Sequence, residues 1–210
     1  MLRNPTFQDL FDKFNQIQFD NDTHTYTLNG NVLTSVTQWV SSFDEPFDTY
    51  SVATKMSKNT GKPVNYYTQY WKMIGEEAIV TGNRVHHFAA WYVSGDKCRD
   101  EREEAVAQFI NDFTEAGWEL VATEFIVYDD TYAGCIDRIM YHPELDKYML
   151  VDFKTTDKDL NESKGKLSNG TPNTLYNKYS MQLNKYKELS GLDAELMIVQ
   201  ITTDYRTYKV

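Results

Sequence analysis

The sequence predicts an α/β fold, with a central mixed β-sheet flanked by helices and a mainly helical extension on the N-terminal side. Residues 101–116 have the apolar spacing of an amphipathic helix, and Gly117 is a suitable C-terminal cap. Three strand-like runs, a helix and two further strands follow, at 118–128, 132–141, 147–154, 175–189, 195–202 and 205–210. A helix between strands in this order allows parallel as well as antiparallel pairs, which predicts a mixed sheet.

The extension is expected to comprise residues 1–80, a β-hairpin and helices packed on a core of residues 81–210. Residues 17–28 alternate like one strand, and Asn29-Gly30 predicts a turn into a second strand at 31–33. Ser35 is expected to cap a short helix that reaches Phe43. Other helices are expected at 7–14, 48–57, 66–77 and 81–93, and the polar stretch 157–174 is typical of a loop.

The composition excludes several classes of protein. The net charge of -10 over 210 residues argues against a broad, non-specific nucleic-acid binder, although it allows a local site where metal ions bridge acids to phosphates. Two cysteines, Cys98 and Cys135, supply neither a disulfide framework nor the four thiolates of an iron–sulfur cluster. No signal peptide, transit peptide or membrane span is expected, so we expect a cytoplasmic protein with no membrane partner.

The strongest local signal is the buried run 147–154, which ends in an acid, an aromatic residue and a lysine. Strand alternation places Asp152 and Lys154 on one face and Phe153 on the other. A salt bridge at a strand end explains Asp-x-Lys by itself, because buried charge needs a partner or a metal. The rest of the chain favours a metal site instead.

Asp137 lies in the preceding strand, three residues after Gly134. If the two strands pair antiparallel, Asp137 and Asp152 can face one another, and two close carboxylates repel unless a cation lies between them. Carboxylate ligands of this kind suit Mg²⁺ or Mn²⁺. A surface acid near a turn is the simpler alternative for Asp137 taken alone.

Three other features accompany these acids. His86 lies one helical turn beyond Gly82, which is expected to let that face approach the sheet, while His87 points about 100° away. Glu124 lies in the strand before Asp137, where it can equally be a half-buried acid. Gln182 and Tyr186 are spaced i and i+4, hence on one helix face.

In this order, Gly82-x-x-x-His86, Glu124, Gly134-x-x-Asp137, Asp152-x-Lys154 and Gln182-x-x-x-Tyr186 resemble the RecB-like branch of the PD-(D/E)XK nuclease superfamily. The set is similar to that of mitochondrial genome maintenance exonucleases and phage exonucleases, and it covers residues 82–190. Ile136 stands where the superfamily name has Pro. The resemblance implies a restriction-endonuclease-like core over residues 81–210.

The resemblance also implies roles for these residues. Asp137 and Asp152, the Phe153 carbonyl and His86 would hold Mg²⁺ or Mn²⁺, and Glu124 would bind a second metal or its water. Lys154 would position the attacking water and offset charge on the phosphate. Gln182 and Tyr186 would orient Lys154 or a phosphate.

The expected function is therefore a metal-dependent deoxyribonuclease, an exonuclease on single-stranded DNA or DNA ends, in the host cytoplasm if phage-encoded and with a replication or recombination protein as partner. An endonuclease of the same fold, a non-cleaving nucleic-acid-binding or regulatory protein, and a structural metal-binding protein remain alternatives. The sequence leaves the oligomeric state open.

An aromatic cluster ahead of the histidine helix, Tyr66, Tyr67, Tyr70 and Trp71, is typical of packing. As a second interpretation it is a platform on which bases stack, and it would flank the metal site together with the loop lysines Lys158, Lys164 and Lys166.

Overall fold

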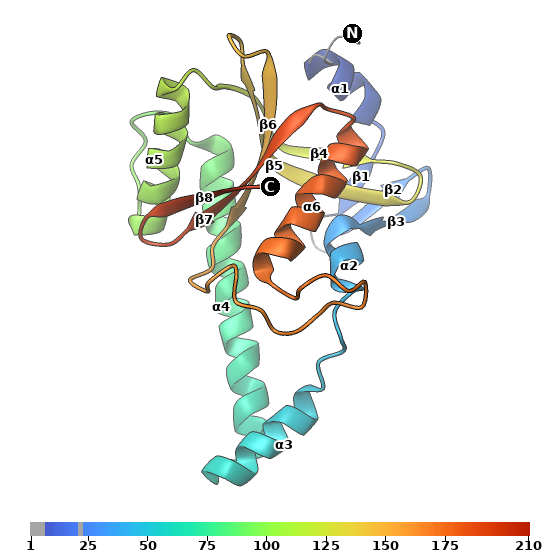
Figure 1. The fold of residues 1–210 in the computed structure, drawn as a ribbon, viewed down its shortest axis with the longest axis vertical. Helices are drawn as coiled ribbons and strands as arrows, with labels where there is room; N and C mark the ends of the chain where they lie inside the picture. The colour runs from blue at the N-terminus through green and yellow to red at the C-terminus, as the bar shows by residue number, and fades with distance from the viewer. Residues whose placement is uncertain (1–6, 21–22) are drawn as a thin grey trace.

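A computed structural model describes residues 7–20 and 23–210 of the chain (Figure 1). It is an α/β structure in which helices flank an eight-stranded mixed sheet, as the sequence predicts. Among the described residues, no helix combines the length and the apolar character needed to cross a membrane.

The centre of the sheet is the long strand β5 (Tyr132–His142). Strand β4 (Glu119–Tyr128) pairs with it antiparallel on one side, and β6 (Lys147–Lys154) pairs antiparallel on the other. The order then continues through β7 (Ala194–Ile201), which is parallel to β6, to the edge strand β8 (Tyr205–Lys209). The helix between β6 and β7 is the crossover that a parallel pair requires.

The N-terminal segment adds three short strands, β1 (Gln18–Asp20), β2 (Thr25–Leu28) and β3 (Asn31–Ser35). The prediction of one strand over 17–28 is wrong, because the chain turns back there and β1 pairs antiparallel with β2. The Asp20 carboxylate accepts a hydrogen bond from the Thr23 amide at 3.2 Å, an interaction that favours a turn over a continued strand.

The Asn29-Gly30 hairpin is confirmed, with φ values of 50° and 80° that suit a type I′ turn. Strand β3 then pairs parallel to the start of β5, so the hairpin belongs to the same sheet as the core.

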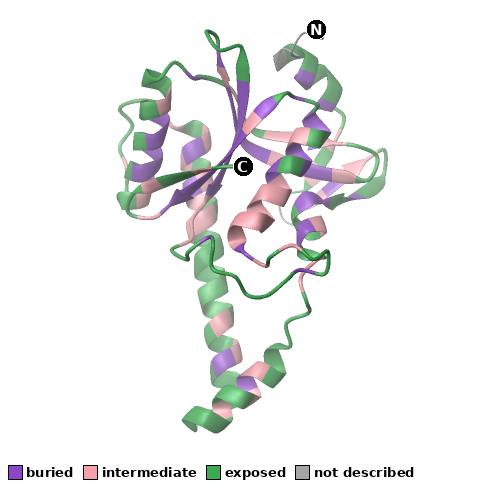
Figure 2. Cartoon of the chain, in the orientation of Figure 1, coloured by how far each residue is buried: buried purple, intermediate pink, exposed green. Residues whose placement is uncertain are grey.

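Two hydrophobic cores lie on opposite faces of the sheet (Figure 2). On one face, α5 (Glu101–Glu115) and the last turns of α4 (Val64–Trp91) pack through Phe109 and Val85 against Phe153 and neighbouring strand residues. On the other, α1 (Phe7–Phe14), α2 (Val36–Ser41) and α6 (Leu175–Ser190) cover β4, β5 and β6. The side chains of the central strands therefore point toward one core or the other, according to the face of the sheet on which they lie.

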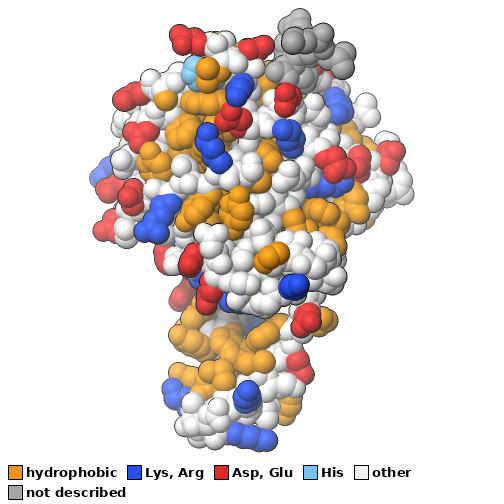
Figure 3. Space-filling model, in the orientation of Figure 1, with side chains coloured by type: hydrophobic (Ala, Val, Ile, Leu, Met, Phe, Trp, Pro, Cys, Tyr) orange, Lys and Arg blue, Asp and Glu red, His pale blue; other side chains and the backbone are white. Residues whose placement is uncertain are grey.

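Helix α4 is one continuous helix, so the prediction of two helices at 66–77 and 81–93 is wrong. No proline interrupts residues 64–91, and a single helical glycine such as Gly75 or Gly82 costs only about 1 kcal/mol. The expected boundary between residues 80 and 81 falls inside this helix. Its first half projects from the core and packs against α3 (Thr49–Thr60) to form an arm, on which hydrophobic side chains gather (Figure 3).

The sheet opens beside β5. Strand β3 pairs with Tyr132 and Ala133, whereas β6 pairs only from Arg138 onward. Among the described strands, none pairs with residues 134–137 on that side. This opening is where the motif residues meet.

Candidate metal centre and lysine site

Asp137 and Asp152 lie opposite one another at the opening. The last antiparallel pair between β5 and β6 is Arg138 with Val151. Asp137 is the residue before Arg138 on β5, and Asp152 is the residue after Val151 on β6, so the two acids lie next to each other just beyond this pair. The Asp137 carboxylate accepts a hydrogen bond of 2.7 Å from the Phe153 backbone amide. The Phe153 side chain points into the opposite core, as strand alternation predicts.

Three side chains form a group that can hold a metal ion: His86 from α4, Glu124 from β4 and Asp137 from β5. One ligand atom of each lies within 4.8 Å of the others. His86 Nδ1 is 3.3 Å from Asp137 Oδ1, whereas His87, the next residue along the helix, is exposed. The helical register predicted for His86 is therefore correct.

The ionisation of this group is arranged around Asp137. The negative charge on Asp137 raises the pKa of His86 to about 9. Burial opposes ionisation of Asp137, but the charge of His86 and hydrogen bonds from His86 and Phe153 lower the pKa of this carboxyl. Desolvation and the charge on Asp137 raise the pKa of Glu124. In the metal-free protein, the proton on His86 thus balances the negative charge of Asp137. A bound cation would balance the same charge, so metal binding should release this proton.

Glu124 is held in an uncommon backbone conformation. Its φ is 48°, in the middle of a strand, where a non-glycine residue pays about 1–3 kcal/mol. Its carboxylate accepts a hydrogen bond from the Cys135 thiol at 3.3 Å. The conformation lies at a candidate ligand, and the residue type alone carries no sign of it.

Lys154 is the start of a second group beside the metal ligands. Its Nζ donates to Asp152 Oδ1 at 3.0 Å and to Gln182 Oε1 at 3.1 Å. The Gln182 amide nitrogen donates in turn to the Tyr186 hydroxyl at 2.7 Å. The i, i+4 pair on α6 thus orients Lys154 through Gln182. Asp152 contacts this lysine and lies outside the three-residue metal group.

Burial disfavours the ammonium of Lys154, but the charges on Asp152 and Asp137 outweigh this effect and raise its pKa. Burial raises the pKa of Asp152, although the lysine opposes this shift. The ammonium also lies 4.7 Å from the ring centroid of Tyr179, a cation–π contact that the sequence analysis missed. Lys154 is therefore a positive charge held in place on several sides.

The two glycines of the motifs behave differently. A Cβ at Gly134 would overlap Cε1 of Tyr186, so only glycine lets the ring lie flat on β5. A Cβ at Gly82 would lie 3.5 Å from Thr155 Oγ1, an ordinary contact. The expectation that glycine is needed at position 82 for a close approach of α4 to the sheet is therefore wrong, because there is room for a methyl group at this position.

Arg138 fixes α4 against the sheet next to Asp137. The side chain is 4% exposed, and its Nη1 donates to the Ala89 carbonyl of α4 at 3.0 Å. Burial lowers the pKa of Arg138 to about 10. This bond holds His86, one turn earlier, at its distance from Asp137. A charged residue inside an apolar strand run was the available signal in the sequence.

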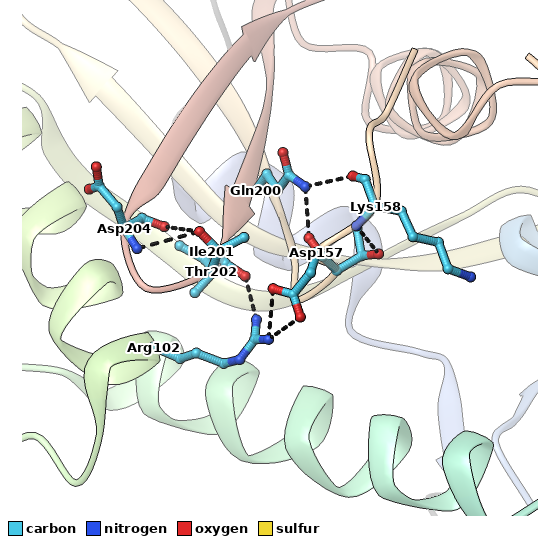
Figure 4. A network of polar contacts seen from close by, with 8 residues as sticks. Arg102, Asp157, Lys158, Gln200, Ile201, Thr202 and Asp204 are labelled. Atoms are coloured by element: carbon cyan, nitrogen blue, oxygen red, sulfur yellow. Dashed lines mark hydrogen bonds and ion pairs between the residues drawn. The ribbon is translucent and has the colours of Figure 1, made fainter. Parts of the chain in front are cut away.

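The chain beyond Lys154 is anchored as well (Figure 4). Gln200, which pairs with Lys154 across β6 and β7, donates to the carbonyls of Thr156 and Lys158 at 2.7 and 2.9 Å. Arg102 of α5 donates to the Ile201 carbonyl at 2.6 Å and to both oxygens of Asp157. These bonds limit the freedom of the strand end that carries the lysine.

The predicted aromatic platform lies far from the metal group. Tyr66 and His86 are 20 residues apart on one helix, a separation of about 30 Å at 1.5 Å per residue. Tyr67 is buried and packs with Trp71 against the arm, whereas Tyr66 and Tyr70 are exposed and stacked. The arm cluster therefore does not flank the site. Lys158 and Lys164 line a separate small cavity of about 80 Å³.

The donor set fits a hard divalent cation. Two carboxylates and one imidazole are within reach of a single ion, and the nitrogen donor suits Mn²⁺ at least as well as Mg²⁺. The structure therefore brings His86, Glu124, Asp137, Asp152, Lys154, Gln182 and Tyr186 to one cavity of about 590 Å³.

In comparisons with known proteins, no protein family matches the chain, and no curated protein does. Among solved structures, the crystal structure of SSO0001 is similar, with 12% identity over 97% of this chain and 74% of that chain. The TM-score is 0.38, which supports no conclusion about fold or function.

Proposed function

We propose that this protein is a divalent-metal-dependent nuclease that hydrolyses phosphodiester bonds in DNA, as an exonuclease on single strands or DNA ends. The proposal includes a restriction-endonuclease-like core, but not the expected boundary between residues 80 and 81, because that boundary falls inside α4. One observation carries it: a positioned lysine and a three-residue metal group share one cavity. Each feature alone has a simpler explanation, whereas together they match the needs of phosphodiester hydrolysis.

Hydrolysis of a phosphodiester needs an activated water, stabilisation of charge on the phosphate oxygens and a way to protonate the leaving oxygen. His86, Glu124 and Asp137 would hold the cation, which when bound would supply positive charge to the phosphate and lower the pKa of a coordinated water. The Phe153 amide holds the Asp137 carboxylate in place before a cation binds.

Lys154 acts as a charge and as a hydrogen-bond donor. Since its pKa is raised, Nζ keeps its proton at neutral pH and is not a general base. Asp152 and Gln182 each hold one N–H direction, which leaves the third for a water or a phosphate oxygen. A donor held in place before the reaction stabilises developing charge more than a mobile lysine can.

Tyr186 is a positioning residue in this scheme. Its hydroxyl accepts the Gln182 amide proton, which directs the amide oxygen of Gln182 toward Lys154. The ring is 3% exposed and rests on Gly134, so its position is determined by packing.

The test is a time course with end-labelled linear DNA in Mg²⁺ or Mn²⁺, beside circular single-stranded DNA of the same sequence. We expect shortening of the linear strand from an end and survival of the circle. Rapid cutting of the circle would replace the exonuclease by an endonuclease. Absence of cleavage from both would leave a non-cleaving binding protein and overturn the proposal.

The matched variants are Lys154→Met and Lys209→Met. Both remove one lysine from the end of a strand, but the Lys209 ammonium is exposed on the edge strand β8. Lys154→Met should lose activity by at least about a hundredfold, in the range of removing one transition-state donor, while Lys209→Met should not. Equal activity in the two variants would remove Lys154 from the mechanism.

A further inference from the structure

The lining of the candidate cavity includes aromatic residues that the proposed chemistry does not use. Besides the metal group and Lys154, its lining includes Phe19, His24 and Tyr26 from the hairpin of β1 and β2, and Trp91 from the end of α4. None of these four belongs to the motif set that the sequence analysis identified. The hairpin and α4 are far apart in the sequence, and residues of both line this cavity.

The hairpin rings form one packed group. Phe19 stacks on Tyr26 with centroids 4.7 Å apart and an interplanar angle of 29°, and the His24 ring meets Phe19 edge-on at 5.1 Å. Tyr26 is 3% exposed and supports the other two, while Phe19 is half-buried and His24 is exposed. His24 has a φ of 52°, a conformation that few residues adopt outside turns. The hairpin thus presents aromatic surface to the cavity over a buried tyrosine.

Trp91 contributes a second aromatic surface. Its side chain is 72% exposed, although it is the largest apolar residue on the last turn of α4. It lies one helical turn beyond His87, so both side chains share a face of α4, and both line the cavity. Trp91 thus adds an exposed indole ring to the lining of the cavity.

We propose that these aromatic residues of the cavity lining hold an unpaired nucleobase, stacked against Trp91 and the hairpin rings, while its phosphate lies at the metal group. The inference rests on the proposed function and narrows its substrate to nucleic acid with an unpaired terminal or looped nucleotide. A base inside a duplex has its two faces covered by neighbouring bases, so it offers no face to a protein ring. An unpaired base exposes its aromatic face, and all four bases have one, so we expect the site to accept any of them.

Binding is tested with a short single strand that carries 2-aminopurine at one end, in Mn²⁺, using Lys154→Met protein so that the strand stays intact. Stacking should quench the fluorescence of this base. Trp91→Ala should weaken binding about 5- to 150-fold and reduce the quenching, the range expected for one base–aromatic stack. Trp91→Phe should recover part of both effects.

The matched control is Tyr50→Ala, which removes an aromatic ring that is 70% exposed on α3 and does not line the cavity. It should bind the strand as the parent does. A blunt hairpin duplex with the same base in its stem should bind more weakly and show no added quenching. Unchanged affinity and quenching in Trp91→Ala would overturn the inference.

The activity assay separates this inference from the proposed function. In the otherwise unchanged enzyme, Trp91→Ala should raise KM with little change in kcat, because stacking acts on ground state and transition state alike. If the unaltered protein cuts no DNA, the nuclease proposal fails, and the fluorescence titration still decides the base site. If it cuts DNA and Trp91→Ala leaves KM unchanged, only the base site fails.

Discussion

Gly134→Ala is the perturbation that most directly tests how the site is built. The new methyl group would overlap Cε1 of Tyr186 and lie 3.1 Å from both its Cδ1 and Cγ2 of Val36. Tyr186 is 3% exposed and Val36 fully buried, so neither can move into solvent. Overpacking of this kind costs about 1–3 kcal/mol, and the reduced freedom of the unfolded chain returns about 0.4–1 kcal/mol.

The overlap with a buried ring puts the cost in the upper half of its range. We therefore expect a net loss of about 1–2.6 kcal/mol in the free energy of unfolding, and a melting temperature lower by about 2–10 °C for a chain of this size. Displacement of the Tyr186 ring should also break its 2.7 Å contact with Gln182 and lower kcat. Urea denaturation and calorimetry measure the first effect, and the end-labelled DNA assay measures the second.

Gly75→Ala is the matched control, because Gly75 lies inside α4 and a Cβ there meets nothing within 4 Å. This variant should gain about 0.5–1 kcal/mol from better helix propensity. The Gly134→Ala penalty should also shrink in a Tyr186→Ala background, where the ring is absent. A Gly134→Ala protein as stable as the parent, or an equal penalty in both backgrounds, would refute the packing argument.

Three other outcomes are expected. Asp152→Asn should abolish cleavage of end-labelled DNA while the far-UV circular dichroism spectrum stays native; retained cleavage removes Asp152 from the site. His86→Ala should weaken Mn²⁺ binding in calorimetric titrations by at least about tenfold, and His87→Ala should not; the reverse order contradicts the helix register. In metal-free protein, the folded-state pKa of His86 is about 9, above its ordinary value of 6.5, so protonation of this residue stabilises the fold. The pH-dependent part of the stability difference between the parent and His86→Ala should therefore be greatest below pH 6.5 and be lost as the pH rises through about 9; a pH-independent difference excludes the ion pair with Asp137.

Local signals in the sequence predicted the individual elements well. Ser35 caps α2 through a reciprocal pair of bonds with Gln38, and Gly191 ends α6 with a φ of 71°. Such features depend on residues within a few positions of one another, so they can be predicted from the local sequence. The end of β1 was not predicted, because a hydrogen bond from the Thr23 amide to the Asp20 side chain favours a turn there.

Part of the site was also predictable, because helix and strand periods determine which side chains share a face. The pair Gln182 and Tyr186 and the choice of His86 over His87 follow from the helical period alone. The facing of Asp137 and Asp152 required one added assumption, antiparallel pairing of their strands, which the structure has.

The sequence by itself thus determined the order of the elements and the faces that carry the motif residues. Only the tertiary structure decided how those faces are placed relative to one another. It supplies the hydrogen bond from Arg138 to α4, the backbone conformation of Glu124, and the cavity that the hairpin rings and Trp91 both line. These contacts join segments separated by tens of residues. Their geometry depends on how two cores pack against opposite faces of one sheet, which no local pattern of residues encodes.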